Sequence, residues 1–425
     1  MRLSGPNAYT IASKIFHGQL ADRHLCYGHI VNPESNERVD EALVSYMLGP
    51  STYTKEDVVE INCHGGTLPL QGVLGLVLRH GARLAQPGEF TLRAFLNGRI
   101  DLTQAEAVLD IIRAKTRESL SLAISGLDGH FSGSIKAIRS NLMDVLAYLT
   151  ARIDFPEDEV EEQDIQISIK QALKEVEQLI STAGAGIIYR QGVRTAIVGR
   201  PNVGKSSVLN RLLREDRAIV TPIPGTTRDT VEEIANLGGI PFVMIDTAGI
   251  LNSNDPVESL GVERSHKAIE QADMKFWVID ISEQMTATNS ELFSLLAEKK
   301  VLAVANKCDL PQQANIESLT WETVCVSALT GDGFSELENK AVNMVLEGRV
   351  VTNDSQLVTN PRHKDALERA QQSLSQALYA IESDMPDDFI TIDLTAALNA
   401  LGEITGEVVK DDLLETIFSN FCIGK

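Results

Sequence analysis

The chain has 425 residues, of which 43% are hydrophobic, and it carries a formal net charge of −21 at pH 7. A chain of this length usually folds into two or three domains. No apolar run approaches the roughly 18 residues that span a bilayer, and the five cysteines lack metal-ligand spacing, so we expect a cytoplasmic protein. This net negative charge argues against tight binding of the protein by itself to nucleic-acid phosphates. An RNA substrate would need a local basic face or a basic partner.

Residues 1–97 have the pattern of a small α/β domain. Helical spacing is expected at 11–16 and 68–79, strands at 26–31 and 40–47, and a strand that ends in a turn within 60–66. Cys63 and His64 could suggest a nucleophile and a base. Adjacent residues on a strand point to opposite faces, so a structural role for Cys63 is the favoured interpretation.

The rest of the chain outside 190–350 is predicted to be helical. Residues 87–102 look like a dense connector, with Asp101 placed to start a helix, and helices are expected at 103–127, 134–153 and 167–183, with a loop at 184–186. The acidic run 154–164 is interpreted as a solvated loop. Three more helices are expected at 362–383, 389–401 and 408–421. The helices before residue 190 and those after residue 350 would each lack packing partners if they stood alone. We therefore predict that they form one discontinuous helical domain, 98–189 plus 351–425, with residues 190–350 inserted into it.

The inserted region opens with a phosphate-binding loop, Gly199-Arg200-Pro201-Asn202-Val203-Gly204-Lys205-Ser206, between an apolar strand and a helical segment. This is the context that the P-loop pattern requires. Backbone N–H groups and the helix N-terminus favour phosphate there. Lys205 is expected to reach the β- and γ-phosphates and Ser206 to bind magnesium. The predicted nucleotide contacts of this loop are Asn202, Val203, Gly204, Lys205, Ser206 and Ser207.

Three further motifs follow strands in the order typical of GTPases. Asp246 would hold magnesium through its water shell, and the Gly249 N–H would meet the γ-phosphate. The Asp309 carboxylate would accept from N1–H and the 2-amino group of guanine, a donor pattern that adenine lacks. The predicted contacts in these motifs are Asp246, Thr247, Ala248, Gly249, Asn306, Lys307, Asp309, Ser327, Ala328 and Leu329. The sequence therefore predicts a GTP-binding domain.

Hydrolysis must use groups other than those of Ras-like switches, because Ile250 stands where they place a water-positioning glutamine. The loop Pro224-Gly225-Thr226-Thr227-Arg228-Asp229 could close over a potassium ion, with Thr227 completing the magnesium shell. Arg228 could act as a finger in cis, although a salt bridge within the loop is the favoured interpretation. Glu258 could order the attacking water, or it could be a surface helix cap.

These features together resemble the MnmE (TrmE) family of tRNA-modifying GTPases, within the TrmE-Era-EngA-like group. The resemblance rests on the Asn-bearing phosphate loop, on Gly225–Asp229, on the inserted GTPase and on the tail Cys422-Ile423-Gly424-Lys425. It implies a homodimeric, potassium-stimulated GTPase that acts with a flavoprotein, MnmG, in a heterotetramer. The complex would add a carboxymethylaminomethyl or aminomethyl group at C5 of the wobble uridine of tRNA, using a tetrahydrofolate one-carbon unit, for which 5-formyl-tetrahydrofolate is the binding analogue. No membrane or DNA is implied.

The same resemblance implies roles for individual residues. Potassium would be held by Asn202 and Thr226 and by carbonyls of Thr221 and Ile223, with Pro222 between them, and magnesium by Ser206 and Thr227. Glu258 would be the hydrolytic carboxylate, with Lys205 at the phosphates. An N-terminal folate-binding and dimerisation domain would use Arg2, Glu60, Arg99 and Lys425. Cys422 would take part in the modification chemistry, or it would be a small buried residue that places Lys425.

The chain also departs from the family pattern. The glycine-rich strand that the family places before Leu3 is absent, and we expect this to weaken the N-terminal fold and the folate site at Arg2. Arg99 stands where lysine is common, which keeps the charge and changes the geometry. One alternative function is a ribosome-assembly GTPase, which binds RNA without substrate chemistry and typically carries a basic appendage. Another is a purely structural dimeric GTPase.

Overall fold

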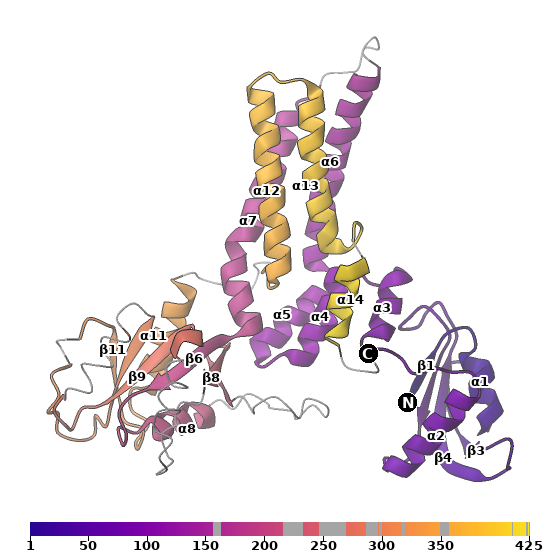
Figure 1. Cartoon of the computed structure of the whole chain (residues 1–425), viewed down its shortest axis with the longest axis horizontal. Coiled ribbons are helices and arrows are strands. Elements are labelled where there is room, and N and C mark those ends of the chain that lie inside the picture. The colour runs from indigo at the N-terminus through magenta and orange to yellow at the C-terminus, as the bar shows by residue number, and fades with distance from the viewer. Residues whose placement is uncertain are drawn as a thin grey trace. The chain divides into compact units, whose positions relative to one another are not determined.

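The computed structural model describes residues 1–155, 163–215, 233–245, 269–285, 296, 300–316, 319–348, 357–409, 411–421 and 424. The chain forms two compact units (Figure 1). The first comprises residues 1–109, 126–136 and 401–425, and the second comprises 110–125 and 137–400. Among the described residues, no helix has the length and apolar character needed to cross a membrane.

The first unit contains a five-stranded antiparallel sheet. Its order is β1 (Arg2–Ser4), β5 (Val58–Asn62), β4 (Arg38–Met47), β3 (Leu25–Val31) and β2 (Phe16–His17). Apolar residues alternate along the strands, so Ile30, Val44 and Ile61 face one side, where they pack with α1 (Ala8–Ile15) and α2 (Thr67–Arg79). The predicted strands and helices of residues 1–79 are confirmed to within a few residues.

This unit also contains α3 (Glu89–Leu96), α14 (Asp411–Ser419) and most of α4 (Leu102–Arg113). The prediction that residues 87–102 form only a connector is wrong, because α3 lies within them. Gly88 precedes α3 with a φ of 68°, and a Cβ there would lie 2.8 Å from the carbonyl oxygen of Phe418. Glycine therefore lets α14 approach α3, and Phe418 and Phe421 pack against Ala94 and Leu102.

Two helix predictions need correction. The helix expected at 103–127 is two helices, α4 and α5 (Arg117–Leu127), because the Thr116 side chain caps α5: its Oγ1 accepts from the Ser119 N–H at 3.1 Å. The loop expected at 184–186 lies inside α7 (Ile165–Gln191). A Cβ at Gly186 would lie 2.4 Å from the Val358 carbonyl oxygen, so this glycine serves close packing rather than a turn.

The second unit contains a six-stranded sheet in the order β11 (Thr323–Val326), β10 (Val301–Asn306), β9 (Met274–Asp280), β6 (Val193–Val198), β8 (Ile240–Ile245) and β7 (Glu233–Leu237). All neighbouring pairs are parallel except β7 with β8. Apolar clusters cover both faces, as parallel sheets require. Helices α8 (Lys205–Glu215) and α11 (Phe334–Leu346) pack into one of them.

The second unit also contains α7, α12 (Pro361–Glu382) and most of α6 (His130–Asp154) and α13 (Asp387–Thr405). Helices α7 and α12 lie side by side (Figure 1). The Arg139 side chain on α6 donates from Nε to the Leu398 carbonyl on α13 at 3.3 Å. Helices from before and after the six-stranded sheet in sequence thus pack together. The domain boundaries proposed from sequence stay a prediction.

Candidate functional site

The phosphate-binding loop lies between β6 and α8, at the carboxyl edge of the parallel sheet, where ligands of α/β folds bind. Positive φ angles at Asn202 (65°) and Gly204 (95°) shape the loop. Lys205 is 9% exposed, and its Nζ donates to the carbonyl oxygens of Gly199 at 2.9 Å and Arg200 at 2.8 Å. Burial lowers the pKa of Lys205. Ser206 and Ser207 are exposed at the start of α8, so the loop, the lysine and the helix N-terminus together form a phosphate cradle.

A second set of predicted residues gathers at the ends of β10 and β11. The Asp309 carboxylate accepts from the Ser327 hydroxyl at 2.6 Å, which orients the carboxylate. The Cys308 N–H donates to the Val326 carbonyl at 3.1 Å and so holds the loop after β10 against β11. Leu329 is 82% exposed beyond this contact. The arrangement presents one fixed carboxylate for the paired N–H donors of a guanine-like base.

Asn306 joins the two loops. Its side-chain Nδ2 donates to the Val203 carbonyl at 2.9 Å, and its Oδ1 accepts from the Ala328 N–H at 3.1 Å. Asn306 is 2% exposed, and a Cβ at Gly204 would lie 2.3 Å from its Nδ2. The phosphate loop therefore needs glycine at 204 both for its backbone angle and for this contact.

Lys307 forms an ion pair with Asp280 at the end of β9. Burial raises the pKa of Asp280, but hydrogen bonds from Lys307 and from Ser282 outweigh it and lower that pKa below its ordinary value. Sequence reasoning missed Asp280. An aspartate directly after the apolar run of β9, whose register partner is Asn306, is the signal that could have found it.

The remaining predicted GTP-site residues lie in 216–232 and 246–268, outside the described residues. Those residues are Thr221, Pro222, Ile223, Pro224, Gly225, Thr226, Thr227, Asp246, Thr247, Ala248, Gly249 and Glu258. Cys422 and Lys425 of the tail also lie outside the described part of the chain. Their predicted roles stay predictions.

In the first unit, the structure brings Arg2 and Arg99 to one aromatic ring and pairs Arg2 with Glu60. Arg2 lies opposite Glu60 in the β1–β5 register, and its Nε donates to Glu60 Oε1 at 2.8 Å. The guanidinium carbons of Arg2 and Arg99 lie 5.8 and 4.6 Å from the centroid of the Tyr53 ring, within cation–π range. Arg2 also lies 5.7 Å from the centroid of Phe90. Sequence reasoning missed both aromatic residues, since no motif marks them.

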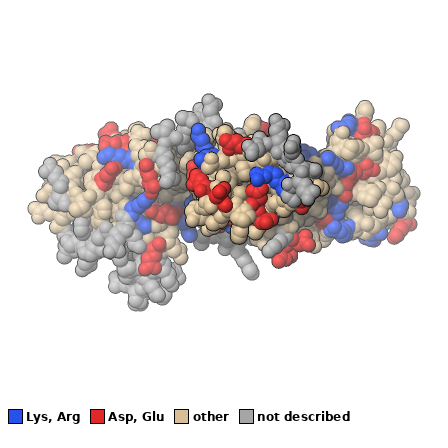
Figure 2. Space-filling view, turned by 90° about the horizontal axis from the view of Figure 1, so that it is seen from above, with Lys and Arg blue, Asp and Glu red and all other residues tan. Residues whose placement is uncertain are grey.

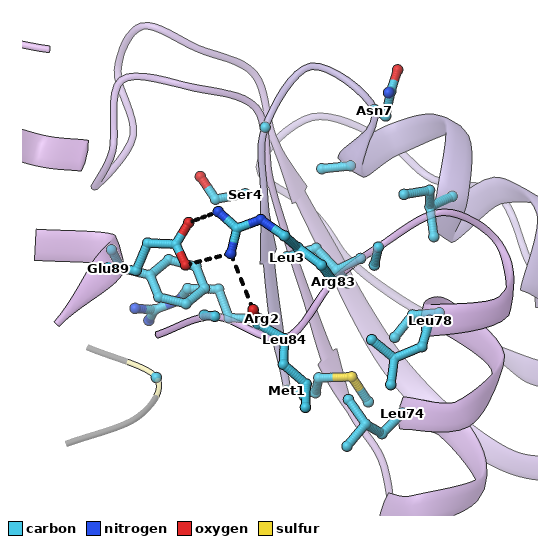
Figure 3. Close-up of a pocket in the computed structure, with 18 of the residues that line it drawn as sticks. Met1, Arg2, Leu3, Ser4, Asn7, Leu74, Leu78, Arg83, Leu84 and Glu89 are labelled. Atoms are coloured by element: carbon cyan, nitrogen blue, oxygen red, sulfur yellow. Dashed lines mark hydrogen bonds and ion pairs between the residues drawn. The ribbon is translucent and has the colours of Figure 1, made fainter. Parts of the chain in front are cut away.

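Arg2 also lines a cavity of about 580 Å³ (Figure 3). Its walls are largely apolar, with Leu74 and Leu78 of α2 on one side and Glu89 and Arg83 on another. Gly424 belongs to the lining. A cavity of this size that mixes apolar walls with a few charged groups is suited to a small organic ligand.

A buried carboxylate, that of Glu89, holds the arginine side chains that line the charged side of this cavity. Glu89 is 7% exposed and accepts from Arg83 at 2.5 and 2.8 Å and from Arg93 at 2.6 and 3.1 Å. Arg93 also donates to Glu56 at 2.9 Å. Burial by itself raises the pKa of Glu89, but these arginines and the Gln86 N–H lower the pKa to about 2. None of these ion-pair residues was predicted from the sequence.

Cys63 is partly buried against the core of the first unit, which agrees with the structural role favoured from the sequence. His64 points elsewhere: its Nδ1 lies 2.8 Å from Asp40 Oδ1. Burial raises the pKa of Asp40, but hydrogen bonds from His64 lower it overall. Within the described residues, no group of His, Cys, Asp and Glu side chains could hold a metal ion.

Comparisons with known proteins place this geometry in a family. Residues 1–99 match the model described as the GTP-binding protein TrmE N-terminus, and residues 102–422 match the MnmE helical domain. The tRNA modification GTPase MnmE of Ligilactobacillus salivarius is 48% identical over 100% of this chain and 94% of its own length. That of Roseiflexus castenholzii is 50% identical over 100% of this chain and 96% of its own.

Among solved structures, a variant of Aquifex aeolicus Era bound to GDP and aluminium fluoride is 29% identical over 43% of this chain and 66% of its own, with a TM-score of 0.30. A TM-score this low carries no weight for the fold. The two family models together cover nearly the whole chain, and the curated relatives align with all of it. The chain therefore belongs to the MnmE (TrmE) family of tRNA modification GTPases.

Proposed function

We propose that this protein hydrolyses GTP in order to modify tRNA. With a flavoprotein partner of the MnmG type, it would add a carboxymethylaminomethyl or aminomethyl group at C5 of the wobble uridine, with the carbon supplied by a tetrahydrofolate one-carbon derivative. The observation that carries the GTP part is Asn306, which holds the phosphate loop and the Asp309–Ser327 pair in one frame. The modification part rests on the family and on the N-terminal residues described above.

Each residue at the GTP site has a definite task in this proposal. Asp309 selects guanine because its carboxylate accepts two N–H bonds that adenine does not offer. Lys205 exchanges its carbonyl partners at Gly199 and Arg200 for the phosphates, and their charge restores its lowered pKa. Ser206 and Thr227 would hold magnesium, which neutralises charge on the phosphates. Asn202 and Thr226, with the Thr221 and Ile223 carbonyls, would hold potassium.

The experiment that tests the GTPase proposal compares hydrolysis in potassium and sodium at equal ionic strength. We expect a much faster rate in potassium, because the chain has Ile250 in place of the usual glutamine and needs another source of positive charge. Glu258→Ala should remove most of the potassium-stimulated rate and leave GDP affinity unchanged. Equal rates in the two salts would contradict the potassium role, and unchanged hydrolysis in Glu258→Ala would contradict the role of that carboxylate.

We further propose that the tetrahydrofolate derivative binds beside Arg2, Glu60 and Tyr53. This ligand combines a flat, hydrogen-bonding ring with an anionic tail, and the site offers an aromatic face, a carboxylate and two guanidinium groups. Gly424 in the cavity lining supports a contribution from the adjacent Lys425. Calorimetric titration with 5-formyl-tetrahydrofolate should show saturable binding that Glu60→Ala and deletion of Lys425 abolish. Glu41→Gln, on an exposed pair with Arg38 in the same sheet, is the matched control and should bind normally.

We propose that a second copy of the chain covers the outer face of the five-stranded sheet. Leu25, Tyr27 and Leu43 on this face are 60%, 63% and 41% exposed, and Tyr27 and Leu43 are register partners. Such an apolar patch on a sheet face is typical of an interaction surface. Sedimentation should give a dimer that Tyr27→Lys dissociates, whereas Tyr379→Lys, at a tyrosine of the other unit that is 65% exposed, should not.

Binding of tRNA would depend on the assembly rather than on overall charge. Lys and Arg side chains lie among Asp and Glu side chains on the face shown in Figure 2, and the net charge is −21. Long-range attraction of a polyanion is therefore weak. We expect tight tRNA binding only when the flavoprotein partner is present, which a filter-binding titration with and without that partner can measure.

A further inference from the structure

The β7–β8 hairpin connects the two chain segments that carry the proposed nucleotide residues Thr227 and Asp246. β8 ends at Ile245, directly before Asp246, and β7 begins at Glu233, shortly after Thr227. The two strands meet in a two-residue turn, Gly238–Gly239, with φ angles of 55° and 85°. Both angles are positive, as in tight hairpin turns that keep the strands closely paired. The hairpin is therefore joined directly along the chain to both segments.

Helix α5 holds the turn from one side. The buried Thr116 hydroxyl donates to the Gly239 carbonyl at 2.8 Å. A Cβ at Gly239 would lie 2.6 Å from Cγ of Glu118, so α5 packs directly on the turn. From the other side, Glu338 on α11 accepts from the Gly238 N–H at 2.6 Å. The turn is thus held between α5 and α11, the helix that packs on the six-stranded sheet.

A second hydroxyl of α5, that of Ser119, contacts the end of α7. Ser119 is 6% exposed, and its Oγ donates to the Tyr189 carbonyl at 2.6 Å, one of the terminal helix carbonyls that lack a partner in the helix. The Thr116 and Ser119 hydroxyl oxygens lie 2.7 Å apart. Two carbonyls and two hydroxyls therefore form one chain of contacts, from Gly239 through Thr116 and Ser119 to Tyr189.

This chain has fewer protons than contacts. Each hydroxyl has a single proton, so two protons serve three contacts: Thr116 to Gly239, Thr116 to Ser119, and Ser119 to Tyr189. If Ser119 donates to Thr116, the Tyr189 carbonyl loses its donor. If Thr116 donates to Ser119, the Gly239 carbonyl loses its donor instead. A third arrangement, in which both hydroxyls donate outward, serves both carbonyls but leaves the two hydroxyl oxygens 2.7 Å apart with no proton between them, which is repulsive. The other two arrangements contain the same number of hydrogen bonds, so exchanging one for the other costs little.

We infer that the Thr116–Ser119 pair is a two-state junction that couples the nucleotide site to helices α5 and α7. In one state the hydroxyls hold the β7–β8 turn, and in the other they hold the end of α7. Thr116 and Ser119 are positioning residues and do not touch the nucleotide. The inference rests on the proposed GTP-dependent function, because the nucleotide is what would bias the hairpin between the two states.

Amide hydrogen exchange of the full chain, read by mass spectrometry with GDP and then with GTPγS, tests the junction. In the wild type we expect the two nucleotides to change exchange in Glu233–Ile245 and in the last turn of α7 in opposite directions. Thr116→Val removes the donor to Gly239, so the hairpin should exchange about three- to tenfold faster, the effect of one lost hydrogen bond, while the α7 end stays protected. The variant also removes the cap of α5, so faster exchange in the first turn of α5 is expected and does not count for or against the junction. Ser119→Ala should give the reverse pattern.

Two further variants separate this role from simple loss of packing. Thr116→Ser keeps the hydroxyl and should restore the wild-type response. Ser181→Ala removes another hydroxyl of the same unit, one that donates to the Gln178 carbonyl on α7, and should leave the nucleotide response intact. If Thr116→Val and Ser119→Ala both raise exchange at both places, the junction is merely structural and the inference fails.

The proposed function and the junction fail in distinguishable ways. Wild-type protein that binds neither GDP nor GTPγS overturns the proposed function. Wild-type protein that binds both nucleotides, with identical exchange at the hairpin and at the α7 end, overturns the junction alone.

Discussion

Replacing Glu89 by glutamine removes a carboxylate that accepts from both Arg83 and Arg93. The pKa of Glu89 is lowered from an ordinary 4.5 to about 2 in the folded chain. Its ionised form therefore stabilises the first unit by about 3 kcal/mol at neutral pH. Because the folded pKa is the lower one, this stabilisation is complete above about pH 5 and is lost as the pH falls toward 2.

The cost of the substitution follows from what remains. Arg83 keeps solvent contact, with 64% of its side chain exposed, and Arg93 keeps Glu56. Neither arginine is left buried without a partner, so we expect Glu89→Gln to destabilise the unit by about 3 kcal/mol at pH 7 and not more. At pH 3 about 2 kcal/mol of the wild-type advantage has gone, so the two proteins should then differ by about 1 kcal/mol.

Urea titrations at pH 7, 5 and 3, followed by a brief deuterium pulse, would measure this difference. Peptides of α3 and β5 report the first unit separately from the rest of the chain. Glu41→Gln, which alters exposed contacts with Arg38 and with the Tyr27 hydroxyl, is the control and should cost less than about 0.5 kcal/mol at every pH. A difference between wild type and Glu89→Gln that stays constant from pH 7 to pH 3 would refute the reasoning, as would a difference below that of the control.

Three other outcomes are expected. Asp309→Asn should weaken GDP binding about 10- to 100-fold and strengthen XDP binding, because the amide can donate a hydrogen bond where the carboxylate only accepts. Fluorescent-nucleotide titration measures both affinities, and equal losses for the two nucleotides would contradict this expectation. Gly204→Ala should weaken GDP binding about tenfold, since the new Cβ would lie 2.3 Å from Asn306 Nδ2 and the φ angle is 95°. Wild-type affinity measured by calorimetry would contradict the role given to the Asn306 contact between the two loops. Tyr53→Ala should raise the Kd for 5-formyl-tetrahydrofolate about three- to tenfold while GDP binding stays unchanged, and an unchanged folate Kd would remove Tyr53 from the site.

Sequence patterns predict best where local chemistry decides the structure. The P-loop needs particular residues at fixed spacing between a strand and a helix, and β6, α8 and the predicted partners Asn306 and Asp309 lie where the motifs require. The strands of residues 1–79 follow from alternation of apolar side chains. In both cases the signal lies within a few neighbouring residues.

Predictions fail where distant residues decide. Nothing near Gly186 in sequence shows that Val358 will pack on it, so a helix interior looked like a loop. Thr116 splits one helical pattern in two because its side chain caps α5 and bonds to Gly239, which lies far along the chain. The contact between Arg93 and Glu56 and the ring of Tyr53 were missed for the same reason, since their partners come from separate elements.

The Asn306 side chain also determines how the guanosine part and the phosphate part of a nucleotide should bind to this protein. One side chain fixes the spacing between the phosphate loop and the base loop before any ligand arrives. A guanosine fragment and a pyrophosphate fragment should therefore bind independently, each meeting a pocket that the other has not reshaped. Joining them in GDP then gains the full advantage of a linked ligand, because no conformational entropy is left to lose between the two pockets.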